Sequence, residues 1–188
     1  MPVTRNIKYD SNKTKTMNSD IQSIPVLVAG ALGRMGSEVI KAINSAKDYE
    51  LVGAIDNQKE KEGQDIGSLI GIGPLNVFVS SDFEGSLCAA SQNVPNDIKN
   101  NGAVLVDFTH PKVAYKHART AIAYGVHPVM GTTGITSDQI EELSKFAEKA
   151  SLGSAIIPNF SVGMVLLQQA AASAARFYEF AELTEMHH

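Results

Sequence analysis

Cysteine is almost absent from the sequence. The single copy, Cys88, cannot form a disulfide within the chain, and this usage suits the reducing cytoplasm, where we expect the protein to work. Cys88 lies in an apolar helical pattern and has no histidine close to it in the sequence. We therefore interpret it as a core residue and not as a reactive thiol.

Long apolar runs and an excess of basic residues are also missing. No run approaches the roughly 18 to 20 apolar residues that are needed to cross a bilayer. The formal net charge of -4 gives no reason to expect nucleic acid or an anionic membrane as a partner. Residues 1–23 are polar and lack the apolar centre of a secretory signal, so we expect a disordered tail there.

From residue 24 onward, short apolar runs alternate with stretches of helical period. A continuous apolar run that ends in glycine or a polar residue is typical of a buried parallel strand. Parallel strands need crossover helices, which cover both faces of the sheet, so we expect a doubly wound α/β fold. The predicted strands are 26–29, 51–55, 77–79, 104–108, 128–130 and 155–157, and the predicted helices are 35–47, 83–92, 113–124, 137–150 and 162–177. Residues 57–76 are expected to form a loop, and Ser137 is expected to be the N-cap of its helix.

Three glycines follow the first predicted strand and open the first predicted helix, at Gly30, Gly33 and Gly36. Such a turn lets a diphosphate approach backbone N–H groups at a helix N-terminus. The spacing is one residue looser than the usual dinucleotide fingerprint. Asp56 ends the second predicted strand, where a carboxylate accepts hydrogen bonds from the adenosine ribose. The combination predicts a Rossmann-like dinucleotide site; the alternative is a tight turn and a loop cap without a ligand.

Asp56 also bears on the choice of cofactor. A carboxylate at this position repels the 2′-phosphate of NADPH and favours NADH. Lys59 and Lys61 are close enough in the sequence to offer a contact to that phosphate. We therefore expect NADH to be preferred, with use of NADPH left open.

Further motifs follow the later predicted strands, at the edge of the sheet where open α/β folds bind ligands. Together with the glycine turn, these motifs closely resemble 4-hydroxy-tetrahydrodipicolinate reductases over residues 24–188. The motifs are Asp107-Phe108-Thr109-His110-Pro111, Gly131-Thr132-Thr133-Gly134, Pro158-Asn159-Phe160-Ser161-Val162-Gly163 and Glu185-Met186-His187-His188.

The resemblance implies an oxidoreductase of the diaminopimelate pathway to lysine, which reduces a cyclic dicarboxylate with NADH or NADPH. It implies a homotetramer for a full-length member. It also implies a diphosphate contact for Gly30, Gly33, Arg34 and Met35, a ribose contact for Asp56, and a nicotinamide contact for Phe108, Thr109, Gly131, Thr132, Asn159 and Phe160. Thr133 would contact the substrate.

The resemblance also implies roles for the two terminal histidines. His187 would donate a proton, and His188 would bind a substrate carboxylate. Histidine suits both tasks because it titrates near neutral pH. The alternative is that the pair is the remnant of a tag. The family continues with a lysine and an anion-binding loop, whereas this sequence stops at His188. We therefore expect a dinucleotide-binding domain at 24–160, the incomplete start of a substrate domain at 161–188, and poor turnover.

Three further histidines lie between residues 110 and 127. We interpret His110 as positional, and His117 and His127 as surface or packing residues. No histidine, cysteine or carboxylate set has metal-ligand spacing, so we expect no metal. A homoserine or aspartate-semialdehyde dehydrogenase would lack the Gly-Thr-Thr-Gly motif, and the latter would need a better placed cysteine. A module that binds NADH without catalysis remains an alternative of another class.

Overall fold

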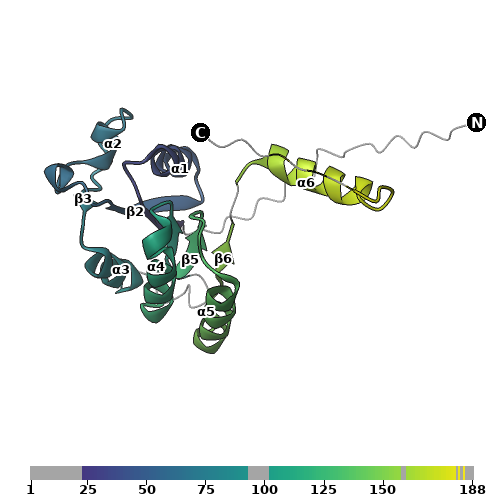
Figure 1. Cartoon of the computed structure of the whole chain (residues 1–188). Helices are drawn as coiled ribbons and strands as arrows, with labels where there is room; N and C mark the ends of the chain where they lie inside the picture. The colour runs from purple at the N-terminus through teal and green to yellow at the C-terminus, as the bar shows by residue number, and fades with distance from the viewer. Residues whose placement is uncertain (1–22, 93–101, 158–159, 181, 183, 185–188) are drawn as a thin grey trace, which may run out of the picture.

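Helices and strands alternate along the chain in a computed structural model that describes residues 23–92, 102–157, 160–180, 182 and 184 (Figure 1). The strands are β1 (Ile24–Ala29), β2 (Tyr49–Ile55), β3 (Val79–Ser80), β4 (Val104–Asp107), β5 (His127–Met130) and β6 (Ala155–Ile156). The helices are α1 (Arg34–Ser45), α2 (Ile66–Leu69), α3 (Phe83–Gln92), α4 (Pro111–Ala123), α5 (Ser137–Ala150) and α6 (Val162–Ala174), with a short 3-10 helix η1 (Lys59–Lys61).

All six strands are parallel and form one sheet in the order β3-β2-β1-β4-β5-β6. The chain builds outward from β1 to β3 and then returns to place β4 on the other side of β1. The direction of winding thus reverses between β1 and β4. Crevices at the carboxyl ends of strands at such a reversal are where open α/β sheets bind ligands.

Apolar side chains on both faces of the sheet hold the helices in place. On one face, Val26 and Val28 of β1 pack with Ile40 of α1 and Ile66 of α2. On the other face, Leu27 packs with residues of α3 and α4, and a third cluster joins α4 to α5. Figure 1 shows α1 and α2 on one side of the sheet and α3, α4 and α5 on the other. The fold is therefore the doubly wound α/β class that the sequence predicts.

Three local predictions are wrong in detail. The stretch 57–76 is not all loop, because it contains η1 and α2. The N-cap of α5 is Thr136 and not Ser137, since the Thr136 hydroxyl accepts from Gln139 N and the Gln139 side chain accepts from Thr136 N. Cys88 is only partly buried on α3, where the Gln92 amide donates to its sulfur at 3.2 Å.

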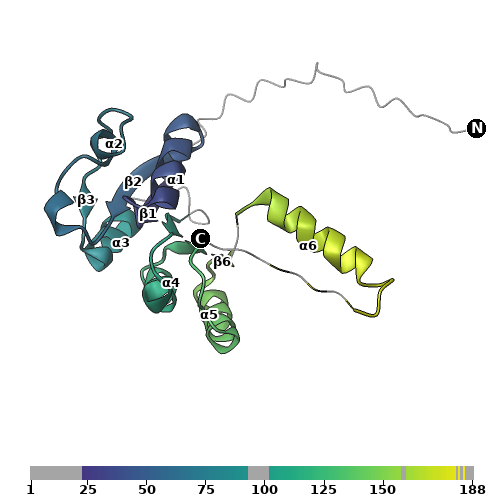
Figure 2. The ribbon, with the colours of Figure 1, turned by 45° about the horizontal axis from the view of Figure 1, so that its top comes forward.

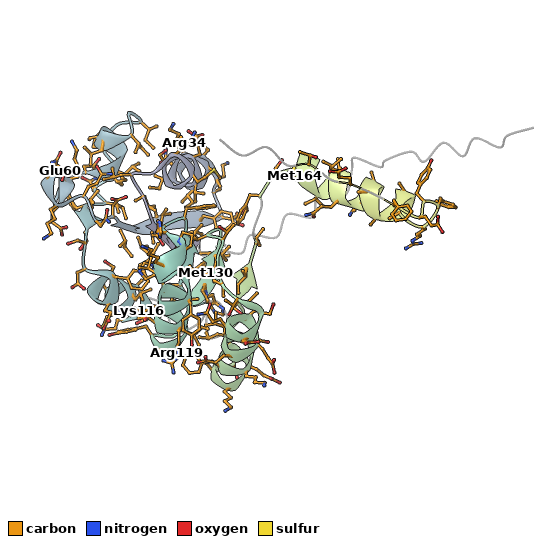
Figure 3. All side chains as sticks on the ribbon, viewed as in Figure 1. Arg34, Glu60, Lys116, Arg119, Met130 and Met164 are labelled. Atoms are coloured by element: carbon orange, nitrogen blue, oxygen red, sulfur yellow. The ribbon has the colours of Figure 1, made fainter. Side chains whose placement is uncertain are left out.

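Helix α6 lies apart from the sheet in both orientations of the ribbon (Figures 1 and 2). No residue of α6 is buried, and Val162 and Leu166 are 73% and 59% exposed. Met164 on this helix lies well away from Met130 in the sheet (Figure 3). Within the described parts of the chain, no helix is long and apolar enough to cross a membrane. The expected tail at 1–23 lies outside the described residues except for Ser23.

Candidate dinucleotide site

The carboxyl ends of the strands are level with one another across the sheet. Ala29 pairs with Ile55 on one side and with Asp107 on the other, and Asp107 pairs with Met130. The residue after each of these four strand ends is Gly30, Asp56, Phe108 or Gly131. Four of the residues that the sequence analysis singled out therefore lie along one edge, on both sides of the point where the winding reverses.

The glycine turn between β1 and α1 requires glycine at two positions. Gly30 has a φ of +75°, and a Cβ there would lie 2.7 Å from the carbonyl oxygen of Phe108. A Cβ on Gly36 would overlap the carbonyl of Gly30, so α1 can approach the turn only without a side chain at this position. Gly33 is the N-cap of α1 and provides no side-chain cap. The turn thus presents backbone and the N-terminus of α1, which suits an anion.

Asp56 is tied to this turn by its side chain. One carboxylate oxygen accepts from the backbone N–H of Leu32 at 3.0 Å, and the other accepts from Gln58 N at 3.2 Å. The carboxylate is only partly buried, so it keeps lone pairs for further donors. A carboxylate held beside a glycine turn at the end of the second strand is the arrangement that binds the ribose hydroxyls of a dinucleotide.

A pocket of about 360 Å³ opens beside Gly30 and Asp56. Its walls come from the ends of β1, β2, β3 and β4, from the first turn of α3 and from the first two turns of α4. The residues that line it are Gly30, Ile55, Asp56, Asn57, Ser81, Phe83, Thr109, His110, Val113 and His117. The mixture of apolar walls with one carboxylate is what a nucleoside requires.

On the other side of the reversal, Phe108 and Gly131 lie against each other. A Cβ on Gly131 would overlap the Phe108 ring, and that ring also meets Phe160 at 5.2 Å between centroids. The adjacent Thr132 is 6% exposed, and its hydroxyl donates to Asp107 at 3.1 Å. Thr132 can therefore contact a ligand mainly through its backbone. Thr133 is exposed and lines a separate hollow between α5 and β6.

Two residues of this edge, Asp107 and His117, form a pair that the sequence analysis did not predict. Asp107 is fully buried at the end of β4, and His117 on α4 meets it with Nδ1 at 2.7 Å. His117 is thus more than the surface or packing residue that the sequence suggests, although its ring does stack on Phe83. The only signal was its position four residues after Val113, which puts both on one face of α4. His110 is positional, as expected, because it caps α4 by accepting from Lys112 N.

The other residues singled out from the sequence are distributed as follows. Arg34 and Met35 begin α1, and both are exposed. Asn159, His187 and His188 lie outside the described residues. Among the residues that the structure describes, no group of three histidine, cysteine or carboxylate side chains is arranged to hold a metal ion.

The sequence of this chain is similar to part of several longer known proteins. The family model for dihydrodipicolinate reductase, N-terminus, matches residues 24–160. A 4-hydroxy-tetrahydrodipicolinate reductase of Prochlorococcus marinus (strain NATL2A) is 84% identical over 172 residues, which are 92% of this chain and 61% of that relative. The enzyme of the same name from Synechococcus sp. (strain CC9605) is 66% identical over 88% of this chain and 59% of its own length. The chain therefore spans about three fifths of the length of these relatives.

Solved structures also resemble this chain. A dipicolinate-bound dihydrodipicolinate reductase from Paenisporosarcina sp. TG-14 is 28% identical with a TM-score of 0.63, over 84% of this chain and 55% of that one. GenD2 from gentamicin A biosynthesis, solved with NAD, shares the fold at 17% identity and a TM-score of 0.59, over 80% of this chain and 39% of its own. The match over most of the chain shows that this protein belongs to the dihydrodipicolinate reductase family.

Proposed function

We propose that the chain is the NADH-binding part of a 4-hydroxy-tetrahydrodipicolinate reductase, which reduces its substrate to tetrahydrodipicolinate on the diaminopimelate pathway to lysine. The observation that carries the proposal is the Asp56 carboxylate, which is fixed to the glycine turn through Leu32 N and also lines the adjacent pocket. Membership of the dihydrodipicolinate reductase family supports the proposal that this edge binds the cofactor. Residues 24–160 would form the dinucleotide-binding domain, and residues 161–188 would begin the substrate domain.

The proposal assigns a role to each residue of the edge. Gly30, Gly33, Arg34 and Met35 hold the diphosphate, and Asp56 holds the adenosine ribose. Phe108, Thr109, Gly131, Thr132, Asn159 and Phe160 surround the nicotinamide. When bound, NADH would supply a hydride, and the 4-hydroxyl group of the substrate would leave as water, so that hydride, proton and lost water together give tetrahydrodipicolinate. His187 then supplies the accompanying proton, while Thr133 and His188 bind the dicarboxylate, a class of ligand to which the dipicolinate of the Paenisporosarcina structure belongs.

NADH is the preferred cofactor in this proposal. A 2′-phosphate would lie beside the Asp56 carboxylate, and the described residues that line the pocket include no lysine or arginine. Lys59 and Lys61 belong to η1 and do not line the pocket. Like charges at short range cost binding energy, so NADPH should bind more weakly.

Titration of the 188-residue chain with NADH, followed by the fluorescence of the cofactor, tests the proposal. We expect saturable binding, and we expect Gly30→Ala to abolish it because the new Cβ would meet Phe108 O. Gly63→Ala is a matched control, since Gly63 has a φ of +73° but no atom within 4 Å of an added Cβ. It imposes the same backbone strain and should leave binding intact. Absence of saturation up to millimolar NADH would disprove the nucleotide site.

A further inference from the structure

A single buried carboxylate connects the two loops that flank the proposed nicotinamide end of the site. Asp107 is 0% exposed, and one of its oxygens accepts from Thr109 N at 2.9 Å, from the Thr109 hydroxyl at 2.6 Å and from the Thr132 hydroxyl at 3.1 Å. Thr109 follows β4 and Thr132 follows β5. The conformation of both loops at the sheet edge therefore depends on one side chain.

The second oxygen of Asp107 is satisfied by His117. An aspartate carboxylate only accepts, so in this pair His117 Nδ1 is the donor across the 2.7 Å to Asp107. The His117 ring is held in this orientation by parallel stacking on Phe83, at 3.9 Å between centroids and 16° between planes. Every buried side-chain polar atom among the described residues has a partner. Removal of His117 would leave a buried charge short of a donor, which is costly.

We propose that Asp107 and His117 are positioning residues, which fix the Thr109 and Thr132 loops in the conformation that receives the nicotinamide. The inference rests on the proposed function, because it assumes that a dinucleotide occupies this edge. The hydroxyls of Thr109 and Thr132 both donate to Asp107, so this carboxylate joins the side chains of the two loops. The adenosine half of the site depends chiefly on Asp56 and the glycine turn, although His117 also lines the pocket beside them.

The test compares NADH with ADP-ribose, which keeps the adenosine and the diphosphate but has no nicotinamide. His117→Phe preserves a ring on Phe83 and removes the donor to Asp107, whereas His117→Asn places an amide N–H near the position of Nδ1. Calorimetry on the full 188-residue chain should show NADH weakened about tenfold by His117→Phe. ADP-ribose should be weakened several-fold less, although His117 also lines the pocket beside Asp56. His117→Asn should restore NADH affinity to within about threefold of the wild type.

A merely structural role predicts a different result. It would lower the thermal unfolding midpoint of both variants without changing the ratio of the two affinities. Equal weakening of NADH and ADP-ribose, or an Asn variant no better than the Phe variant, would overturn the proposal. If His117→Phe does not fold, Thr132→Val removes one donor from Asp107 in nearly the same shape, with Thr132→Ser as control, and should give the same split. A wild-type chain that binds neither nucleotide would disprove the proposed function itself.

Discussion

Asp56 contributes to both the glycine turn and the adjacent pocket. Its carboxylate accepts from Leu32 N inside the glycine turn, and it lines the pocket that the turn borders. The same side chain therefore shapes the diphosphate site and faces the proposed ribose. Replacement of Asp56 should therefore weaken dinucleotide binding both at the diphosphate and at the ribose.

Asp56→Ala should weaken NADH binding by about 1 to 3 kcal/mol, the scale of charge-assisted hydrogen bonds left unmade. NADPH should lose less, because the repulsion of its 2′-phosphate disappears together with the hydrogen bonds. Fluorescence titration with both cofactors measures the difference. Asp138→Ala removes an exposed carboxylate from the first turn of α5 and serves as a control that leaves both affinities unchanged. Equal losses for the two cofactors would show that Asp56 does not face the ribose.

At the scale of single residues, the sequence predicted those site residues that lie close together along the chain. Gly30, Gly36 and Asp56 were identified because a strand, a turn and a second strand lie within one short unit of chain. The pair of Asp107 and His117 was missed because the contact joins a strand end to the second turn of a helix, and neither residue type is unusual in its own neighbourhood. Only the fold brings such residues together.

At the scale of elements, the segment between β2 and β3 is organised by one carboxylate. Asp65 is the N-cap of α2 and accepts from Ser68 N at 2.8 Å, from Leu75 N at 3.0 Å and from Asn76 N at 2.7 Å. These hydrogen bonds, first of all the one from the Ser68 backbone, hold the pKa of Asp65 below its ordinary value. The ionised form is thus favoured in the folded chain.

Asp65→Ala should lower the thermal unfolding midpoint by a few degrees near neutral pH. Because the folded pKa is depressed, the stabilisation is fully present above the unfolded value of about 4 and is lost as the pH falls through the folded pKa. The difference in midpoint between wild type and Asp65→Ala should therefore shrink below about pH 4. Calorimetric scans across this range measure it. Asp65→Asn, which keeps an acceptor and a good N-cap, should lie between the two, and a difference independent of pH would contradict the ionic explanation.

The helices also show which elements a sequence pattern can predict and which it cannot. The helix at 83–92 was predicted as a weak helix and has its predicted bounds; its buried residues Leu87 and Ala90 lie three positions apart, on one face. The helix η1 and the single turn of α2 are too short to produce a period, so 57–76 was taken as loop. At α5, the cap was misplaced by one residue because Thr136 and Ser137 are both good N-cap residues. The side chain of Gln139 decides between them.

At the scale of the whole molecule, α6 differs from every other long helix. Apart from Gln168 and Gln169, its large side chains are apolar, yet none is buried, and the exposed group continues to Phe177 and Phe180. Exposed apolar patches of this kind mark surfaces that bind another part of a protein. The relatives are longer than the matched part by about two fifths of their length, since the alignments cover 61% and 59% of them. We expect that additional part to cover α6 and to complete the substrate site.

Cofactor binding and substrate binding should therefore separate in this chain. The residues proposed to hold NADH all lie within residues 30–160, so the 188-residue chain should bind NADH. It should show no appreciable binding of pyridine-2,6-dicarboxylate, measured by calorimetry with NADH present.

A chain extended by the additional residues of the 84% identical relative should bind both ligands and reduce the substrate. In that longer chain, His187→Ala should lower the rate by about 100-fold, the usual effect of removing a general acid. If the 188-residue chain binds the dicarboxylate as tightly as the longer one, the substrate site is complete without the additional part. If His187→Ala leaves the rate unchanged, the proton comes from another group.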